Sequence, residues 1–163
     1  MSGGTTETID RAAHESVNTA GRGRILLVED QAVVRESLAR LLRIEGYEVT
    51  CAANGLEALV AAEAMAALAS ARSGRPPADL VLLDVVLPKM SGVQFLEELR
   101  REGRGAWAAV PIVLLTGAMD AKQIARAREL GARDVLVKAR FQVDDLLRRV
   151  GQHVRGEPLQ GAA

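Results

Sequence analysis

Four short aliphatic runs, each followed by a charged or hydroxyl side chain, constrain the fold of this chain more than any other feature. The runs span residues 25–28, 80–83, 112–115 and 135–137. Continuous aliphatic runs of this length are typical of parallel strands that are covered by helices on both faces. We therefore predict an α/β fold built on a parallel sheet.

The residues that follow these runs carry groups that can bind or react. Glu29 and Asp30 follow the first run, Asp84 the second, Thr116 the third and Lys138 the fourth. In open parallel sheets, ligands bind just beyond the carboxyl ends of the strands. We therefore expect three carboxylates, a hydroxyl and an ammonium group to meet in one crevice.

Strand and helix patterns alternate from residue 24 onward. Strands are predicted at 24–29, 47–52, 79–84, 110–116 and 134–137, and helices at about 34–45, 54–73, 92–102, 120–131 and 143–154. Five strand–helix units with right-handed crossovers give a doubly wound, five-stranded parallel sheet of order 2-1-3-4-5, the flavodoxin-like arrangement. This topology alone places Asp30 beside Asp84. Asp120 is the expected N-cap of the fourth helix.

The chain divides into three segments by composition. Residues 1–22 are rich in Gly, Ser, Thr and charge, and we expect a disordered N-terminal arm because such a segment buries little apolar surface. Residues 23–155 are long enough for one domain. Residues 156–163 form a short polar tail, and we expect a stand-alone domain with no output domain behind it.

The charge balance and the apolar content exclude several classes of partner. Lys and Arg together number 21, as do Asp and Glu, so no basic excess points to nucleic acid or to anionic lipid. No apolar stretch approaches the ~20 residues that a membrane span needs, and the N-terminus lacks a signal-peptide core. The single cysteine, Cys51, is expected as a small buried residue on the second strand, and its isolation fits a reducing cytoplasm.

The segment 82–92, with the sequence LLDVVLPKMSG, is very similar to the phosphorylation-loop signature of one known family. Together with the acidic pair, Thr116 and Lys138, it makes residues 24–154 resemble the receiver domain of two-component response regulators. The resemblance implies that Asp84 accepts a phosphoryl group, a reaction open to a carboxylate nucleophile. It also implies that Thr116 and Lys138 bind phosphoryl oxygens.

A metal ion is expected at the acidic cluster. Placing the carboxylates of Glu29 and Asp30 beside Asp84 costs free energy unless a cation neutralises their charge. Mg²⁺ fits such a site, because it binds one or two carboxylates together with waters and a phosphate oxygen. We expect Asp30 and Asp84 to ligate directly and Glu29 to act through water. The resemblance adds the backbone carbonyl of Val86 as a ligand.

The sequence departs from the family pattern on strand five and its loop. Val135 stands at the switch position, which is commonly aromatic, and Ala139 follows Lys138 where the family usually has a cis-proline. Val86 and Ala118 are apolar at positions where polar side chains help to place an attacking water, so we expect a long-lived acyl phosphate.

A third departure is the stretch 61–77, which is longer than usual in the family. It is either an Ala-rich, solvated extension of the second helix or a docking element for a partner.

The leading functional hypothesis is a single-domain response regulator. It would receive a phosphoryl group on Asp84 from a sensor histidine kinase or a histidine phosphotransfer protein and then bind an unidentified downstream protein. Such a signalling domain is not a classical enzyme, although it promotes its own phosphoryl transfer and dephosphorylation. One alternative is a receiver-fold adaptor that works without phosphorylation. A flavodoxin-like enzyme or nucleotide binder is a third, but the chain has no P-loop and no Gly-rich turn after the first strand.

Overall fold

Five parallel strands form one sheet in the computed structural model, which describes residues 21–72, 74–101, 104–117 and 121–155. The strands are β1 (Arg24–Val28), β2 (Glu48–Ala52), β3 (Leu80–Asp84), β4 (Ile112–Thr116) and β5 (Ala132–Val137). Their order across the sheet is β2-β1-β3-β4-β5, which confirms the predicted doubly wound, flavodoxin-like topology.

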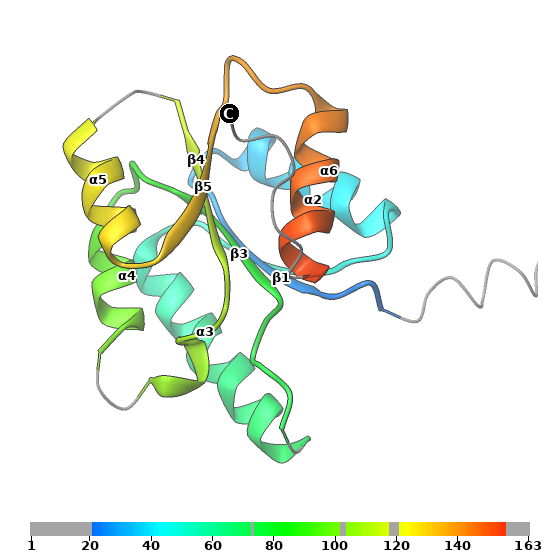
Figure 1. The fold of residues 1–163 in the computed structure, drawn as a ribbon, viewed down its shortest axis with the longest axis vertical. Coiled ribbons are helices and arrows are strands. Elements are labelled where there is room, and N and C mark those ends of the chain that lie inside the picture. The colour runs from blue at the N-terminus through cyan, green and yellow to red at the C-terminus, as the bar shows by residue number, and fades with distance from the viewer. Residues whose placement is uncertain (1–20, 73, 102–103, 118–120, 156–163) are drawn as a thin grey trace, which may run out of the picture.

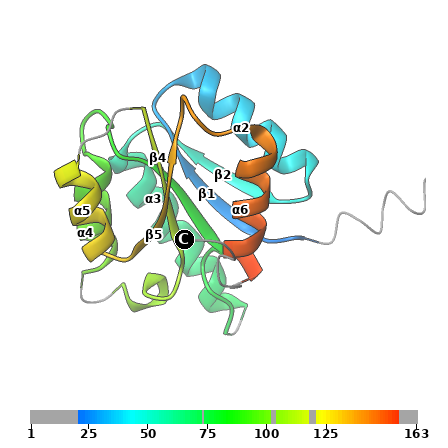
Figure 2. The same ribbon diagram turned by 45° about the horizontal axis from the view of Figure 1, so that its top comes forward.

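The helices cover both faces of this sheet. They are α2 (Ala32–Ile44), α3 (Gly55–Ala71), α4 (Gly92–Leu99), α5 (Ala121–Glu129) and α6 (Val143–Arg155), with a short 3-10 helix, η1 (Gly105–Trp107). Figures 1 and 2 show α2 and α6 on one face and α3, α4 and α5 on the other. None of the helices in the described part of the chain is long and apolar enough to cross a membrane.

Two apolar layers hold the helices to the sheet. Alternate residues of a strand point to opposite faces, so Leu26 and Val28 pack towards α3 and α4, whereas Ile25 and Leu27 pack towards α2 and α6. The residues of β3 and β4 are all buried, as strands covered on both faces should be. The core is therefore continuous from β1 to β4, and it leaves polar side chains only at the strand ends.

Capping residues set where the helices begin. Asn54 accepts a hydrogen bond from the backbone N–H of Glu57 at 2.9 Å and starts α3, as predicted. Ser91 and Gln94 form a capping box at the start of α4. The loop between β3 and α4 is therefore held at both ends. Asp84, the last residue of β3, lies at one end, and the cap of α4 lies at the other.

Several expectations about the strands were wrong. β4 begins at Ile112 rather than at residue 110, after Pro111, which has no backbone N–H to pair. β5 begins at Ala132 rather than at residue 134, because a register shift opposite Ile112 and Val113 lets the strand pair earlier. Cys51 is exposed rather than buried, because β2 is an edge strand of the sheet.

Other expectations concern residues beyond the described ones. Asp120, Ala118, residues 1–20 of the N-terminal arm and the tail 156–163 all lie outside the described residues. Arg22 is described, and its backbone N–H donates to the Gly46 carbonyl at 3.2 Å.

A buried charged cluster fastens α6 to the edge strand β5. The Asp134 carboxylate lies 3.1 Å from His153 Nε2 and 3.0 Å from Arg149 Nη1, and it accepts a hydrogen bond from the Val135 backbone N–H at 2.8 Å. Burial by itself raises the pKa of Asp134, but the bonds from His153 and Val135 and the charge of Arg149 outweigh it and lower the pKa. The charged form of Asp134 therefore stabilises the folded chain.

We expect Asp134→Asn to lower the free energy of unfolding by about 2 kcal/mol at neutral pH, because the change removes a buried charge that three groups satisfy. Since the folded-state pKa is lowered, this contribution is complete above about pH 5 and is lost as the pH falls below about 4 through the folded-state pKa. Urea unfolding of both proteins at neutral pH and at about pH 3 measures the loss. A difference that stays the same at both pH values would contradict the account. Asp144→Asn, at an exposed position on α6, is the control and should change stability by less than about 0.5 kcal/mol.

Candidate functional site

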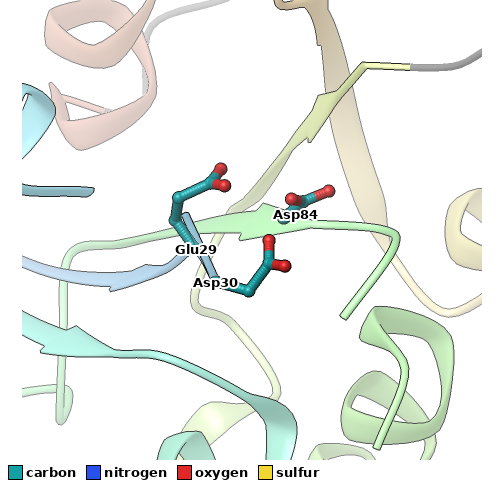
Figure 3. Close-up of side chains that lie close together, drawn as sticks. All are labelled: Glu29, Asp30 and Asp84. Carbon is teal, nitrogen blue, oxygen red and sulfur yellow. The ribbon is translucent and has the colours of Figure 1, made fainter. Parts of the chain in front are cut away.

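The carboxyl ends of β1 and β3 bring the three predicted acidic residues together. Val28 of β1 is the register partner of Leu83 of β3, so the chain leaves both strands at the same edge of the sheet. Oxygen atoms of Glu29, Asp30 and Asp84 lie within 4.8 Å of one another. Figure 3 shows the three carboxylates gathered in a common space beyond the end of β3.

Both carboxylate oxygens of Asp84 have a partner. Its Oδ2 lies 2.9 Å from the Nζ atom of Lys138, and its Oδ1 accepts a hydrogen bond from the Val86 backbone N–H at 3.1 Å. The side chain is almost fully buried. The carboxylate is therefore held in one orientation, with an ammonium group on one oxygen and a backbone dipole on the other.

Lys138 links all the strand ends of the site. Its Nζ atom lies 2.6 Å from Glu29 Oε2 as well as 2.9 Å from Asp84 Oδ2. Its backbone N–H donates to the Thr116 carbonyl at 2.8 Å, which continues the β4–β5 pairing up to the site. One side chain from β5 therefore bridges the acidic residues at the ends of β1 and β3.

Burial and charge shift the pKa values of this ion pair. Burial is the largest influence on Glu29 and raises its pKa, the Asp84 charge raises it further, and the bond from Lys138 offsets part of the rise. Burial alone would lower the pKa of Lys138, but its bonds to Glu29 and Asp84 outweigh burial and raise the pKa. Lys138 therefore stays charged across the neutral range.

The charges of the site do not balance among the described residues. Three carboxylates face one ammonium group, and the nearby Arg35 guanidinium donates to the backbone carbonyls of Glu29 and Asp30 rather than to their carboxylates. Arg35 was missed by the sequence reasoning, although a basic residue on the first turn after an acidic pair is a usable signal. Clustered carboxylate oxygens with excess negative charge suit a hard divalent cation such as Mg²⁺.

Thr116 and Val135 lie on the strands beside Asp84. Thr116 ends β4, is buried, and comes one residue after Leu115, the register partner of Asp84. Val135 is half-buried on β5 and packs with the apolar layer below α3, α4 and α5, so it belongs to a helix-facing layer and not to the carboxylate cluster.

The loop after β3 approaches the site through its backbone. A Cβ atom on Gly92 would lie 2.4 Å from the Asp84 carbonyl oxygen, so only glycine fits there without moving the loop. The Gly92 N–H also donates to the Val85 carbonyl at 3.0 Å. The Val86 side chain is 58% exposed beside Asp84. On the opposite loop, the bond between Lys138 and Ala139 is trans, as are all peptide bonds among the described residues.

Comparisons with known proteins agree with this geometry. Residues 25–151 match the response regulator receiver domain family. The DNA-binding response regulator MtrA of Mycobacterium tuberculosis (strain ATCC 25618 / H37Rv) is 37% identical over 134 residues, which cover 82% of this chain and 51% of MtrA. The chain therefore spans about half the length of the curated relatives that it matches.

Solved structures show the same fold. A CheY-like response regulator receiver domain protein from Methanospirillum hungatei JF-1 has a TM-score of 0.65 at 26% identity, over 82% of this chain and 94% of that one. Chemotaxis protein CheY4 of Vibrio cholerae has a TM-score of 0.63 at 29% identity, over 79% of this chain and 96% of that one. With its strand order, its cluster of strand-end residues and a family match over most of its length, the chain belongs to the response regulator receiver domain family.

Proposed function

We propose that this receiver domain accepts a phosphoryl group on Asp84 from a phosphohistidine of a sensor kinase or phosphotransfer protein, and that the phosphorylated form binds a protein target. One observation carries the proposal: the Asp84 carboxylate is held between the Lys138 ammonium group and the Val86 N–H, next to two further acidic residues. Phosphoryl transfer needs mainly positioning and charge stabilisation, and this site supplies both.

The transfer step follows from these contacts. An Asp84 carboxylate oxygen attacks phosphorus in line, the bond from phosphorus to the donor imidazole nitrogen breaks, and its electron pair stays on the imidazole. Lys138 moves its hydrogen bond from Asp84 to a phosphoryl oxygen as charge shifts onto the phosphoryl group. We assign the Thr116 hydroxyl to a second phosphoryl oxygen, because Thr116 lies at the end of the strand next to β3.

We assign a Mg²⁺ site to the same residues. Asp30 and Asp84 would ligate directly, with the Val86 carbonyl as a further ligand, and Glu29 would act through water because its carboxylate already binds Lys138. The ion would neutralise charge shared by the carboxylates and the phosphoryl oxygens.

Several finer expectations remain predictions. MtrA is named a DNA-binding regulator and is about twice as long as the matched segment. That the domain stands alone, makes no contact with nucleic acid and lies in the cytoplasm therefore stays a part of this proposal.

Asp84→Asn should abolish phosphorylation and leave the fold intact, because only the nucleophile is lost. The wild-type chain is incubated with acetyl phosphate and Mg²⁺, and its intact mass should rise by one phosphoryl group that hydroxylamine removes, as expected of an acyl phosphate. Asp144→Asn, at an exposed acidic position, should be phosphorylated like the wild type. Phosphate on the Asp84→Asn protein would reject the assignment. An unmodified wild type would favour the phosphorylation-independent adaptor.

Asp30→Ala should weaken Mg²⁺ binding by about tenfold or more, because it removes the most exposed carboxylate of the cluster. The affinity is read from amide chemical shifts during titration with Mg²⁺ alone. Glu36→Ala, an exposed acidic position on α2, is the matched control and should keep the wild-type affinity. Equal affinities in the two variants would show that general surface charge, and not a site at Asp30, attracts the ion.

The resemblance to receiver domains implies that the target binds the face formed by α5, β5 and α6, and we expect the conformational response of this face to be small. A modification can shift an equilibrium only by its different interactions with the two states, and Val135 offers no ring that could rotate inward. With beryllofluoride, a phosphoryl mimic, we expect smaller amide shifts in β5 and α6 than around Asp84. The Asp84→Asn protein, which cannot hold the mimic, gives the baseline. Large, concerted shifts through β5 and α6 would show that another residue drives the switch.

A further inference from the structure

Helix α3 presents an apolar face to solvent. Leu56, Val60 and Leu68 are 48%, 69% and 57% exposed. The other exposed positions of the helix are three alanines, Ala64, Ala67 and Ala71, and three polar residues, Glu57, Glu63 and Ser70. The buried face of the helix is also apolar, so α3 carries few polar side chains for a surface helix.

This composition is unusual for a helix at the surface of a protein. Such helices normally carry charged residues on the solvent side, and a helix that is apolar all round is normally covered on all sides. In its 17 residues α3 carries two charged side chains, Glu57 and Glu63. Figure 1 shows its last turns extending beyond the sheet, at the end opposite the carboxylate cluster. The exposed large apolar residues run from Leu56 in the first turn to Leu68 near the end of the helix.

We propose that a second copy of this chain covers the face, with the two α3 helices packed antiparallel about a two-fold axis at Ala64. In that register Val60 of each copy lies opposite Leu68 of the other, and Ala64 lies opposite itself. The alanines at the centre let the two helix axes approach closely, while the larger side chains fill the space on either side. The contact is self-complementary, as a two-fold interface requires.

The charges at the two ends of the helix support this choice of partner. In the same register Glu57 of one copy comes next to Arg72 of the other, and the symmetry repeats this pair. Arg72 is exposed and is the C-cap of α3, and it has no ion-pair partner among the described residues. A parallel arrangement would bring the two Glu57 carboxylates together, which is unfavourable. The charges therefore favour the antiparallel dimer.

Sedimentation of the full, unphosphorylated chain tests the dimer, so the result does not depend on the proposed role of Asp84. From about 1 μM to about 1 mM the weight-average mass should rise from one chain to two. Val60→Lys should weaken dimerisation by about 100-fold or more, because each dimer would bury two unpaired ammonium groups. Val33→Lys is the matched control, since Val33 is 78% exposed on α2, and it should dimerise like the wild type. A monomer at all concentrations, or equal behaviour of the two variants, would overturn the proposal.

Disulfide trapping tests the register. In a Cys51→Ser background, Ala64→Cys should form an intermolecular disulfide on oxidation, because two copies of residue 64 meet at the axis. Ala125→Cys, at an exposed position on α5, should stay monomeric under the same conditions. Cross-linking through Ala125→Cys alone would place the dimer contact on another face and would reject the α3 interface.

Discussion

The pairing of Lys138 with Glu29 and Asp84 is the interaction on which the rest of the site depends. Three carboxylates at adjoining strand ends repel one another, and Lys138 is the basic side chain that contacts two of them among the described residues. Its position is set by the backbone bond from Lys138 N–H to the Thr116 carbonyl. The edge strand β5 therefore leads directly into the site, because Lys138, which follows it, offsets part of the negative charge of the acidic cluster.

The scaffold keeps its polar groups away from the centre of the sheet. The buried polar residues are few, and they either belong to the site, cap a helix or fasten α6 to β5: Glu29, Asp84, Thr116, Asn54, Asp134 and His153. A buried polar group costs free energy unless it is hydrogen-bonded, so each lies where a strand end, a helix start or the contact of α6 with β5 offers a partner. The same rule concentrates the charged groups of the site at the carboxyl ends of the strands.

The departures from the family pattern lie on β5 and the loop after it, between the acidic cluster and the α5–β5–α6 face that is expected to bind a target. Val135 lies in the helix-facing apolar layer of β5, and the bond before Ala139 is trans. The acidic cluster and Lys138 are in place regardless, so the proposed phosphorylation and the proposed response to it depend on separate parts of this chain. The apolar face of α3 lies on a different helix, and an assembly through it would leave the α5–β5–α6 face open for a partner.

The sequence by itself determined the sheet, its order and the residues at its edge, because aliphatic runs, caps and crossover rules are local or topological signals. The sequence could not determine contacts between elements that lie far apart along the chain, because these contacts form only when the elements pack together. The Arg35 bonds to the acidic loop, the two-residue-earlier start of β5 and the exposure of Cys51 depended on tertiary pairing. So did the Asp134–His153 contact, because two polar residues of α6 and β5 form a buried cluster only when the helix packs on that strand.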